Sequence, residues 1–142
     1  MPTLNSAIGA SASALSAERT RIEVAVSNMA NAESTRGADG QPYRRRDVVL
    51  ASAPIESFDA ALGKADATGV AVSGIVEDAS PFTRRYDPAH PDAAAEGFVA
   101  LPNVNVPEQM VDMLSASRAY QANLAAIGII NDMVRRAMDL GK

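Results

Sequence analysis

Apolar residues in the last third of the chain recur four and three residues apart, which is the spacing of a helix that packs along one stripe. The members of this stripe are Val106, Met110, Met113, Tyr120, Leu124, Ile127, Val134 and Met138. Only Ser117 and Asn131 interrupt it. Pro107 suits the first helical position, and Gly141 can end a helix in the left-handed conformation. The pattern therefore predicts a helix over about 107–140.

The first 31 residues carry a second stripe with the same spacing. Its members are Leu4, Ile8, Leu15, Ile22, Ala25 and Met29, with Ser11 and Glu18 at the two remaining positions. Because a helix in water is stabilised mainly by burying an apolar face, each stripe needs a partner. The stripes have similar lengths, so we expect a helix over 3–31 to pair with the helix over 107–140.

Both helices also carry apolar residues away from these stripes. With about 100° per residue, three such residues lie nearly opposite a stripe residue. They are Val24, Ile129 and Met133. Residues 1–17 and 119–131 contain no charged side chain, although a helix with one side in water normally has a charged outer face. Two explanations are open: the middle of the chain covers these residues, or neighbouring subunits do.

The pattern assigns two kinds of packing residue. Those expected to pack between helices are Leu15, Ile22, Met29, Met110, Leu114, Leu124, Ile127 and Val134. Those expected to form contacts between subunits are Val24, Ile129 and Met133. Polar residues within a stripe lower stability but can fix the register and the choice of partner.

The region between the helices, residues 32–105, contains six of the eight prolines, which disfavours helix. Short strands are predicted at 43–52, 69–77, 82–86 and 97–101. Gly74 suggests a bulge or a close backbone approach. Residues 53–68 are expected to form a flexible loop, and residues 87–92 a turn with two prolines. The predicted fold class is α+β, with long terminal helices paired as a coiled-coil-like bundle around a small antiparallel β insert. The expected division is 1–35 and 106–142 for the helical domain and 36–105 for the insert.

Composition excludes several classes of protein. The net charge is −4, so a general nucleic-acid binder is not expected. The absence of cysteine excludes disulfides and thiol chemistry. No stretch reaches the roughly 20 apolar residues of a membrane span. The N-terminus lacks the basic and continuous apolar regions of a cleaved signal peptide, so export, if it occurs, needs another route.

One group of residues could suggest metal binding or catalysis: Asp87, His90, Asp92 and Glu96. There is no second histidine, and the group lies in a segment braced by prolines. We interpret it as a turn and expect no enzyme activity, cofactor, metal site or small-molecule substrate. The run Arg44 to Arg46 would alternate between faces of a strand, so it forms no single basic patch. It is either a solvated or salt-bridged edge or a set of ion pairs between subunits.

Several blocks resemble one known family. Asn28-Met29-Ala30-Asn31, followed by Thr35 and Gly37, is similar to the Asn-x-Ala-Asn signature of the axial rod and hook proteins of the bacterial flagellum. Further similar blocks stand in the expected order at 42–45, 74–78, 86–93, 97–99, 102–105, 110–113 and 115–123. The residues that carry the family motif are Asn28, Ala30, Asn31, Thr35, Asn103, Asn105, Arg118 and Tyr120. Residues 53–68 show no similarity.

This resemblance implies a structural subunit of the proximal rod of the basal body. In such proteins the terminal helices form an inner domain, and subunits stack helically around an export channel and transmit torque. The implied partners are copies of the chain, other proximal and distal rod proteins, the adaptor joining rod to ring, and the flagellar type III export apparatus. The implied location is the rod where it crosses the periplasm, reached without a cleaved signal.

The alternative from another class is a free coiled-coil adaptor or regulator that binds a partner helix. It predicts stable, protected helices in the isolated chain and a complex of fixed stoichiometry. A rod subunit predicts a largely disordered free chain that becomes ordered on incorporation. Circular dichroism and amide exchange separate the two.

Overall fold

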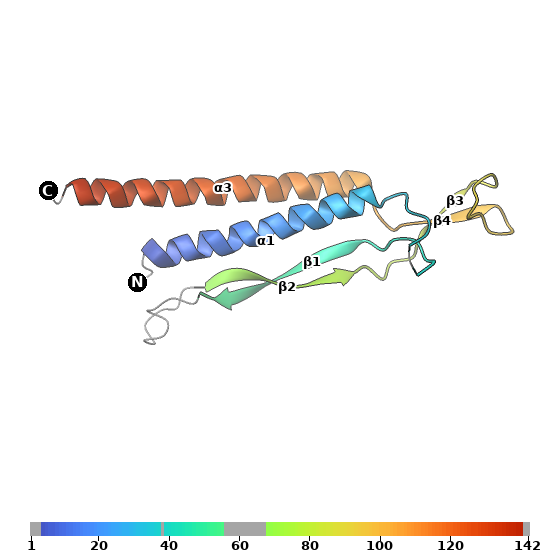
Figure 1. Ribbon diagram of the computed structural model, residues 1–142, viewed down its shortest axis with the longest axis horizontal. Helices are drawn as coiled ribbons and strands as arrows, with labels where there is room; N and C mark the ends of the chain where they lie inside the picture. The colour runs from blue at the N-terminus through green and yellow to red at the C-terminus, as the bar shows by residue number, and fades with distance from the viewer. Residues whose placement is uncertain (1–3, 38, 56–67, 141–142) are drawn as a thin grey trace.

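The computed structural model describes residues 4–37, 39–55 and 68–140. Two long helices, α1 (Leu4–Ala30) and α3 (Val106–Asp139), run antiparallel, so the two chain ends lie at the same end of the molecule (Figure 1). Both helices fall within a few residues of their predicted bounds. The predicted α+β class, with paired terminal helices around a small antiparallel insert, is confirmed. Within the described residues, neither helix has a stretch apolar enough to cross a membrane.

The start of α3 follows from its sequence. Pro107 occupies the first turn, where its missing N–H costs no hydrogen bond, and Glu108 complements the positive end of the helix dipole. Asn105 is the N-cap residue; its backbone carbonyl accepts the first helical hydrogen bond, from Gln109 N at 3.1 Å. At the other end Arg136 lies in the last turn and complements the negative end of the dipole.

The interface between the helices is built on small and polar residues. The buried residues of the two helices are Ser6, Ala17, Ala25 and Asn28 in α1 and Gln109 and Ala116 in α3. Alanine at these positions allows the backbones to approach closely. The larger apolar residues flank this line and are only partly covered.

The stripe of α3 that faces α1 therefore differs from the predicted one. Gln109 is buried and Asn123 half-buried, whereas the neighbouring Met110 and Leu124 are exposed. Ile127 and Val134 are half-buried, as are Leu15, Ile22 and Met29 of α1. Leu114 is exposed. The predicted stripe was drawn from the large apolar residues alone. The interface with α1 instead includes the small residue Ala116, which is fully buried, so α3 presents a different side to α1 than predicted.

A β hairpin lies along α1 on the side away from α3, so α1 is the middle layer of three (Figure 1). Its strands are β1 (Arg46–Pro54) and β2 (Thr68–Glu77), paired antiparallel from Arg46↔Glu77 to Pro54↔Thr68. The register shifts beside Gly74, which confirms the predicted bulge. The expected loop 53–68 is partly wrong because its ends belong to these strands, and its residues 56–67 lie outside the described residues.

A second, separate hairpin follows. The strands β3 (Thr83–Tyr86) and β4 (Phe98–Leu101) pair from Thr83↔Leu101 to Tyr86↔Phe98. The insert is thus two two-stranded sheets and not the single small sheet expected from the sequence. The predicted turn at 87–92 is confirmed. Val99 is the largest fully buried apolar side chain among the described residues, so the core is small.

Candidate functional site

Asn28, in the last turn of α1, is the centre of a buried group of polar side chains. Its side chain is 1% exposed and makes four hydrogen bonds. The amide nitrogen donates to the carbonyl of Arg46 at 2.8 Å and to Oε1 of Gln109 at 2.7 Å. The amide oxygen accepts from the Tyr43 hydroxyl at 2.9 Å and from the Arg46 amide at 3.0 Å. One side chain therefore joins α1, the start of β1 and the first turns of α3 with its full hydrogen-bonding capacity.

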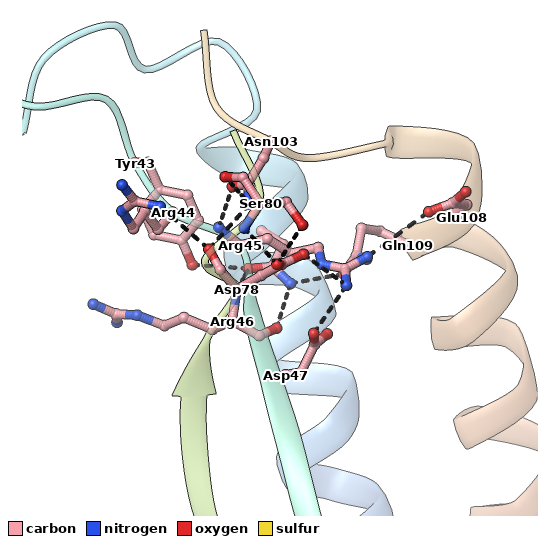
Figure 2. A network of polar contacts seen from close by, with 11 residues as sticks. Tyr43, Arg44, Arg45, Arg46, Asp47, Asp78, Ser80, Asn103, Glu108 and Gln109 are labelled. Carbon is pink, nitrogen blue, oxygen red and sulfur yellow. Dashed lines mark hydrogen bonds and ion pairs between the residues drawn. The ribbon is translucent and has the colours of Figure 1, made fainter. Parts of the chain in front are cut away.

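Asn103 performs a similar role just before α3. Its Oδ1 accepts from the backbone N–H of Arg45 at 2.9 Å, and its Nδ2 donates to the carbonyls of Asp78 and Ser80 at 3.2 and 3.4 Å. Figure 2 shows these residues gathered where the two helices and the first hairpin meet. We call this group, Asn28, Tyr43, Arg45, Arg46, Asp78, Asn103 and Gln109, the polar junction.

The arginine run at 44–46 is paired within the chain. The Nη2 atom of Arg45 lies 3.0 Å from a carboxylate oxygen of Asp47 and 3.0 Å from one of Asp78. Its Nη1 atom lies 3.8 Å from a carboxylate oxygen of Glu108 in α3 (Figure 2). Arg44 lies over the ring of Phe82, and Arg46 forms an ion pair with Glu77. Of the two interpretations of this run, the salt-bridged edge is the one that the single chain shows.

Asp78 is ionised more readily than an ordinary aspartate. Hydrogen bonds from the hydroxyl and the backbone N–H of Ser80 lower its pKa, and the positive charges of Arg45 and Arg44 act in the same direction. The carboxylate therefore remains available to Arg45 below the pH at which exposed aspartates become protonated.

The candidate metal residues hold the turn and attach it to the loop after α1. His90 Nδ1 accepts a hydrogen bond from the Asp92 backbone N–H at 3.1 Å. The Asp92 carboxylate accepts from the Thr35 hydroxyl at 2.8 Å and lies 3.5 Å from Arg36. In the described part of the chain, no three His, Asp or Glu side chains lie close enough together to hold a metal ion.

The other motif residues are distributed between the junction and α3. Asn31 donates to the carbonyl of Ser27 at 2.8 Å and accepts from Ser34 Oγ, which closes the end of α1. Ala30 is exposed at the same end, and Asn105 begins α3. Arg118 is exposed and Tyr120 half-buried, both in α3 after the first turns that meet the junction. The motif thus marks mainly the meeting point of the elements.

Two of the three residues expected to contact other subunits are open on the single chain. Ile129 is 61% and Met133 56% exposed, on the side of α3 that no other described element covers. Val24 is different: it is half-buried and shares a small cavity of about 130 Å³ with Val48 of β1. The middle of the chain therefore covers part of α1, while one side of α3 stays uncovered. We call this side the outer face of α3; with about 100° per residue, its exposed apolar members are Val111, Leu114, Ile129 and Met133.

Sequence reasoning did not find Gln109 and Tyr43, although both contact Asn28. A signal for Gln109 was present, because it stands seven residues before Ala116, the most buried residue of α3. A heptad pattern counted from the small residue Ala116, instead of from the large apolar residues, would have placed Gln109 at the interface between the helices. Tyr43 stands in the family-like block at 42–45 and was expected to begin the strand at 43–52; that start was wrong, because β1 begins at Arg46 and Tyr43 lies outside regular structure.

Comparison with known proteins agrees with this architecture. Residues 95–140 match the family described as "Flagellar basal body rod FlgEFG protein C-terminal". The chain is 43% identical over 130 residues to the flagellar basal-body rod protein FlgC of Salmonella typhimurium, covering 92% of each chain. It is 44% identical over 145 residues to FlgC of Bacillus subtilis, covering 95% of this chain and 96% of the relative. FlgC of Agrobacterium fabrum is 37% identical over 143 residues, covering 100% of this chain and 98% of the relative. These relatives are structural rod proteins and not enzymes, and the chain belongs to the FlgC family of flagellar basal-body rod proteins.

Proposed function

We propose that this chain, as a structural subunit of the flagellar basal-body rod, is completed by neighbouring subunits that cover the outer face of α3. The observation that carries this proposal is the exposure of large apolar residues along that face, including Ile129 and Met133. Residues 119–131 add no charged side chain that would keep the face in water. Large apolar residues exposed together on one side of a helix mark a site of protein association.

The energetic gain from covering the face is substantial. Each isoleucine or leucine newly covered by a neighbour contributes about 1.5–3 kcal/mol before the costs of association. Within the described residues, β1 and β2 lie against α1 and approach α3 only beside its first turns, so they do not cover Ile129 and Met133. A neighbouring subunit can supply this cover.

The finer assignment rests on the kinship with FlgC and on the sequence blocks. The chain is a proximal rod subunit that assembles with copies of itself, with other proximal and distal rod proteins, and with the adaptor that joins rod to ring. It reaches the rod in the periplasm through the flagellar type III export apparatus, without a cleaved signal. Torque passes between subunits through the packed side chains of the outer faces. The free adaptor is not favoured, because the relatives are rod proteins.

The test is a charge placed on the outer face of α3. Ile129→Asp should leave export intact and abolish incorporation into basal bodies, because a buried unpaired carboxylate is strongly disfavoured. Asn131→Asp is the matched control, since it adds the same charge two residues away at an exposed polar position. Secretion, incorporation into isolated basal bodies and swimming are measured for both variants. Normal swimming of the Ile129→Asp strain would refute the proposal.

A further inference from the structure

The strands β3 and β4 form the end of the molecule farthest from both chain termini (Figure 1). Arg84 pairs with Ala100 and Tyr86 with Phe98. Paired residues in an antiparallel sheet lie on the same face, as do residues two apart, so these four share one face. We call it the tip face. The intervening pair contains Val99, which is fully buried, so the tip face points away from the rest of the chain.

The tip face exposes two aromatic side chains in a chain that has only six. Tyr86 is 66% and Phe98 41% exposed. Their rings meet edge to face, with centroids 5.3 Å apart. Aromatic residues exposed together in this way are typical of the anchor residues of protein interfaces.

The Tyr86 ring is held in place before any partner arrives. Gly97 adopts a φ of +79°, which glycine accepts without strain, and the ring packs directly on it. A Cβ atom at this position would lie 2.9 Å from Cε2 of Tyr86 and 3.3 Å from Cβ of Pro88. A fixed ring loses little conformational entropy when it is buried in a partner, which favours binding.

Charge indicates what kind of partner fits. Arg84, on the tip face, and its neighbour Arg85 form no ion pair within the described residues. The arginines between Arg19 and Arg46 are engaged by carboxylates or by an aromatic ring, whereas those of α3, like Arg84 and Arg85, form no ion pair among the residues that the structure describes. An arginine beside a fixed tyrosine can bind a carboxylate with two parallel hydrogen bonds.

We propose that the tip face docks a second, different protein that presents a carboxylate beside an apolar pocket. The pocket receives Tyr86 with the edge of Phe98, and the carboxylate binds Arg84. A lipid surface is a poorer fit, because anionic membranes are bound by clusters of at least about four basic residues, whereas this hairpin carries only Arg84 and Arg85. This contact lies apart from the outer face of α3 and is independent of how the helices stack.

The test is site-specific photo-crosslinking in cells that make this chain as their only copy. p-Benzoylphenylalanine replaces Tyr86, the cells are irradiated, and the adduct is identified by mass spectrometry. We expect one discrete adduct with another protein, at a peptide that contains Asp or Glu. Its yield should fall at least about tenfold in Arg84→Glu, which corresponds to the loss of about 1.4 kcal/mol. Arg135→Glu is the control, because Arg135 is also exposed but lies near the far end of α3.

A further variant confirms the pairing of charges. Changing the mapped carboxylate of the partner to lysine should restore the adduct of the Arg84→Glu chain. An adduct with a second copy of this chain, an adduct with lipid, no adduct, or a yield unaffected by Arg84→Glu would each overturn the proposal. Circular dichroism of the purified variants checks that the fold is kept, as expected for exposed positions.

Discussion

Asn28 is the residue whose replacement should cost this chain the most stability. Leucine has the same branching and number of side-chain heavy atoms as asparagine but neither donates nor accepts a hydrogen bond. In Asn28→Leu the side chain of Gln109, the hydroxyl of Tyr43 and both backbone groups of Arg46 each lose a partner. The substitution therefore disconnects α1 from β1 and from α3 in one step.

The expected loss follows from these contacts. Four hydrogen bonds at about 1 kcal/mol each give about 4 kcal/mol. The Gln109 side chain, 5% exposed, cannot turn to water, and its unsatisfied oxygen adds about 1–2 kcal/mol. The greater apolar surface of leucine offsets about 1–2 kcal/mol. The net loss should be roughly 3–5 kcal/mol, a large fraction of the roughly 5–15 kcal/mol that stabilises a domain.

The assay is urea unfolding followed by circular dichroism, in trimethylamine N-oxide so that a marginally stable chain is brought into its folded range. Asn123→Leu is the matched control, because Asn123 bonds only to the carbonyl of Ala119 in its own helix, at 2.9 Å. Its free energy of unfolding should change by less than about 0.5 kcal/mol.

A double variant tests the coupling across the two helices. Gln109→Leu added to Asn28→Leu removes the unsatisfied oxygen, so the pair should cost at least about 1 kcal/mol less than the sum of the single variants. Equal losses in Asn28→Leu and Asn123→Leu would refute the claim that the polar junction holds the elements together. Strict additivity would refute the claim that Gln109 depends on Asn28.

Four further variants have outcomes that follow from contacts elsewhere in the chain. Gly69→Ala should cost about 1–3 kcal/mol in urea unfolding, because its Cβ would lie 2.5 Å from a side-chain oxygen of α1. Gly74→Ala, with open space around it, should cost less than about 0.5 kcal/mol. Because the pKa of Asp78 is lowered in the folded chain, its carboxylate stabilises the fold at pH values above the ordinary aspartate pKa. This stabilisation is lost as the pH falls through the lowered pKa of the folded state. Ser80→Ala should raise that pKa, as measured by NMR titration. His90→Ala should leave rod assembly and swimming intact, because the imidazole accepts only a hydrogen bond within its own turn; assembled rods without motility would contradict this.

The sequence predicted the elements well because their signals are local. Both helices have long apolar periods and recognisable ends, so their bounds were found to within a few residues. The strands around Gly74 and Val99 are short, β-branched and bounded by turn residues. A local sequence pattern does not show which strands pair with one another. For this reason the insert was expected to form one sheet, whereas it forms two.

The side of each helix that faces its partner was harder to predict. A heptad count favours large residues such as Met110 and Leu124, yet these are exposed and the contact runs through Ala116. Two helix backbones approach closely where the side chains between them are small. A search for a stripe of large apolar residues does not detect such positions. Val24 was expected between subunits, but the first hairpin covers part of it by folding back along α1, and this long-range contact has no local signal.

The candidate site shows the same division. Asn28 and Asn103 were marked by the family motif, but their roles follow only from partners far along the chain, such as Gln109, 81 residues after Asn28. Whether a buried polar side chain finds its hydrogen-bond partners depends on distances and angles in the folded chain, which the spacing of residues in the sequence does not give. Two residues of the tip face, Tyr86 and Phe98, lie in blocks similar to the family, but the sequence assigned neither of them a role.

The way the chain divides its polar and apolar groups explains why assembly suits it. Hydrogen bonds are directional, and those of the polar junction are completed inside one subunit, so they define its shape without help from a neighbour. The outer face of α3 is left with apolar groups, whose burial is not directional and requires no partner atom at a fixed angle. A neighbour can therefore cover Ile129 and Met133 without rearranging the junction. A charge at Ile129 should then spare the fold and destroy the assembly, whereas the loss of Asn28 should damage the fold first.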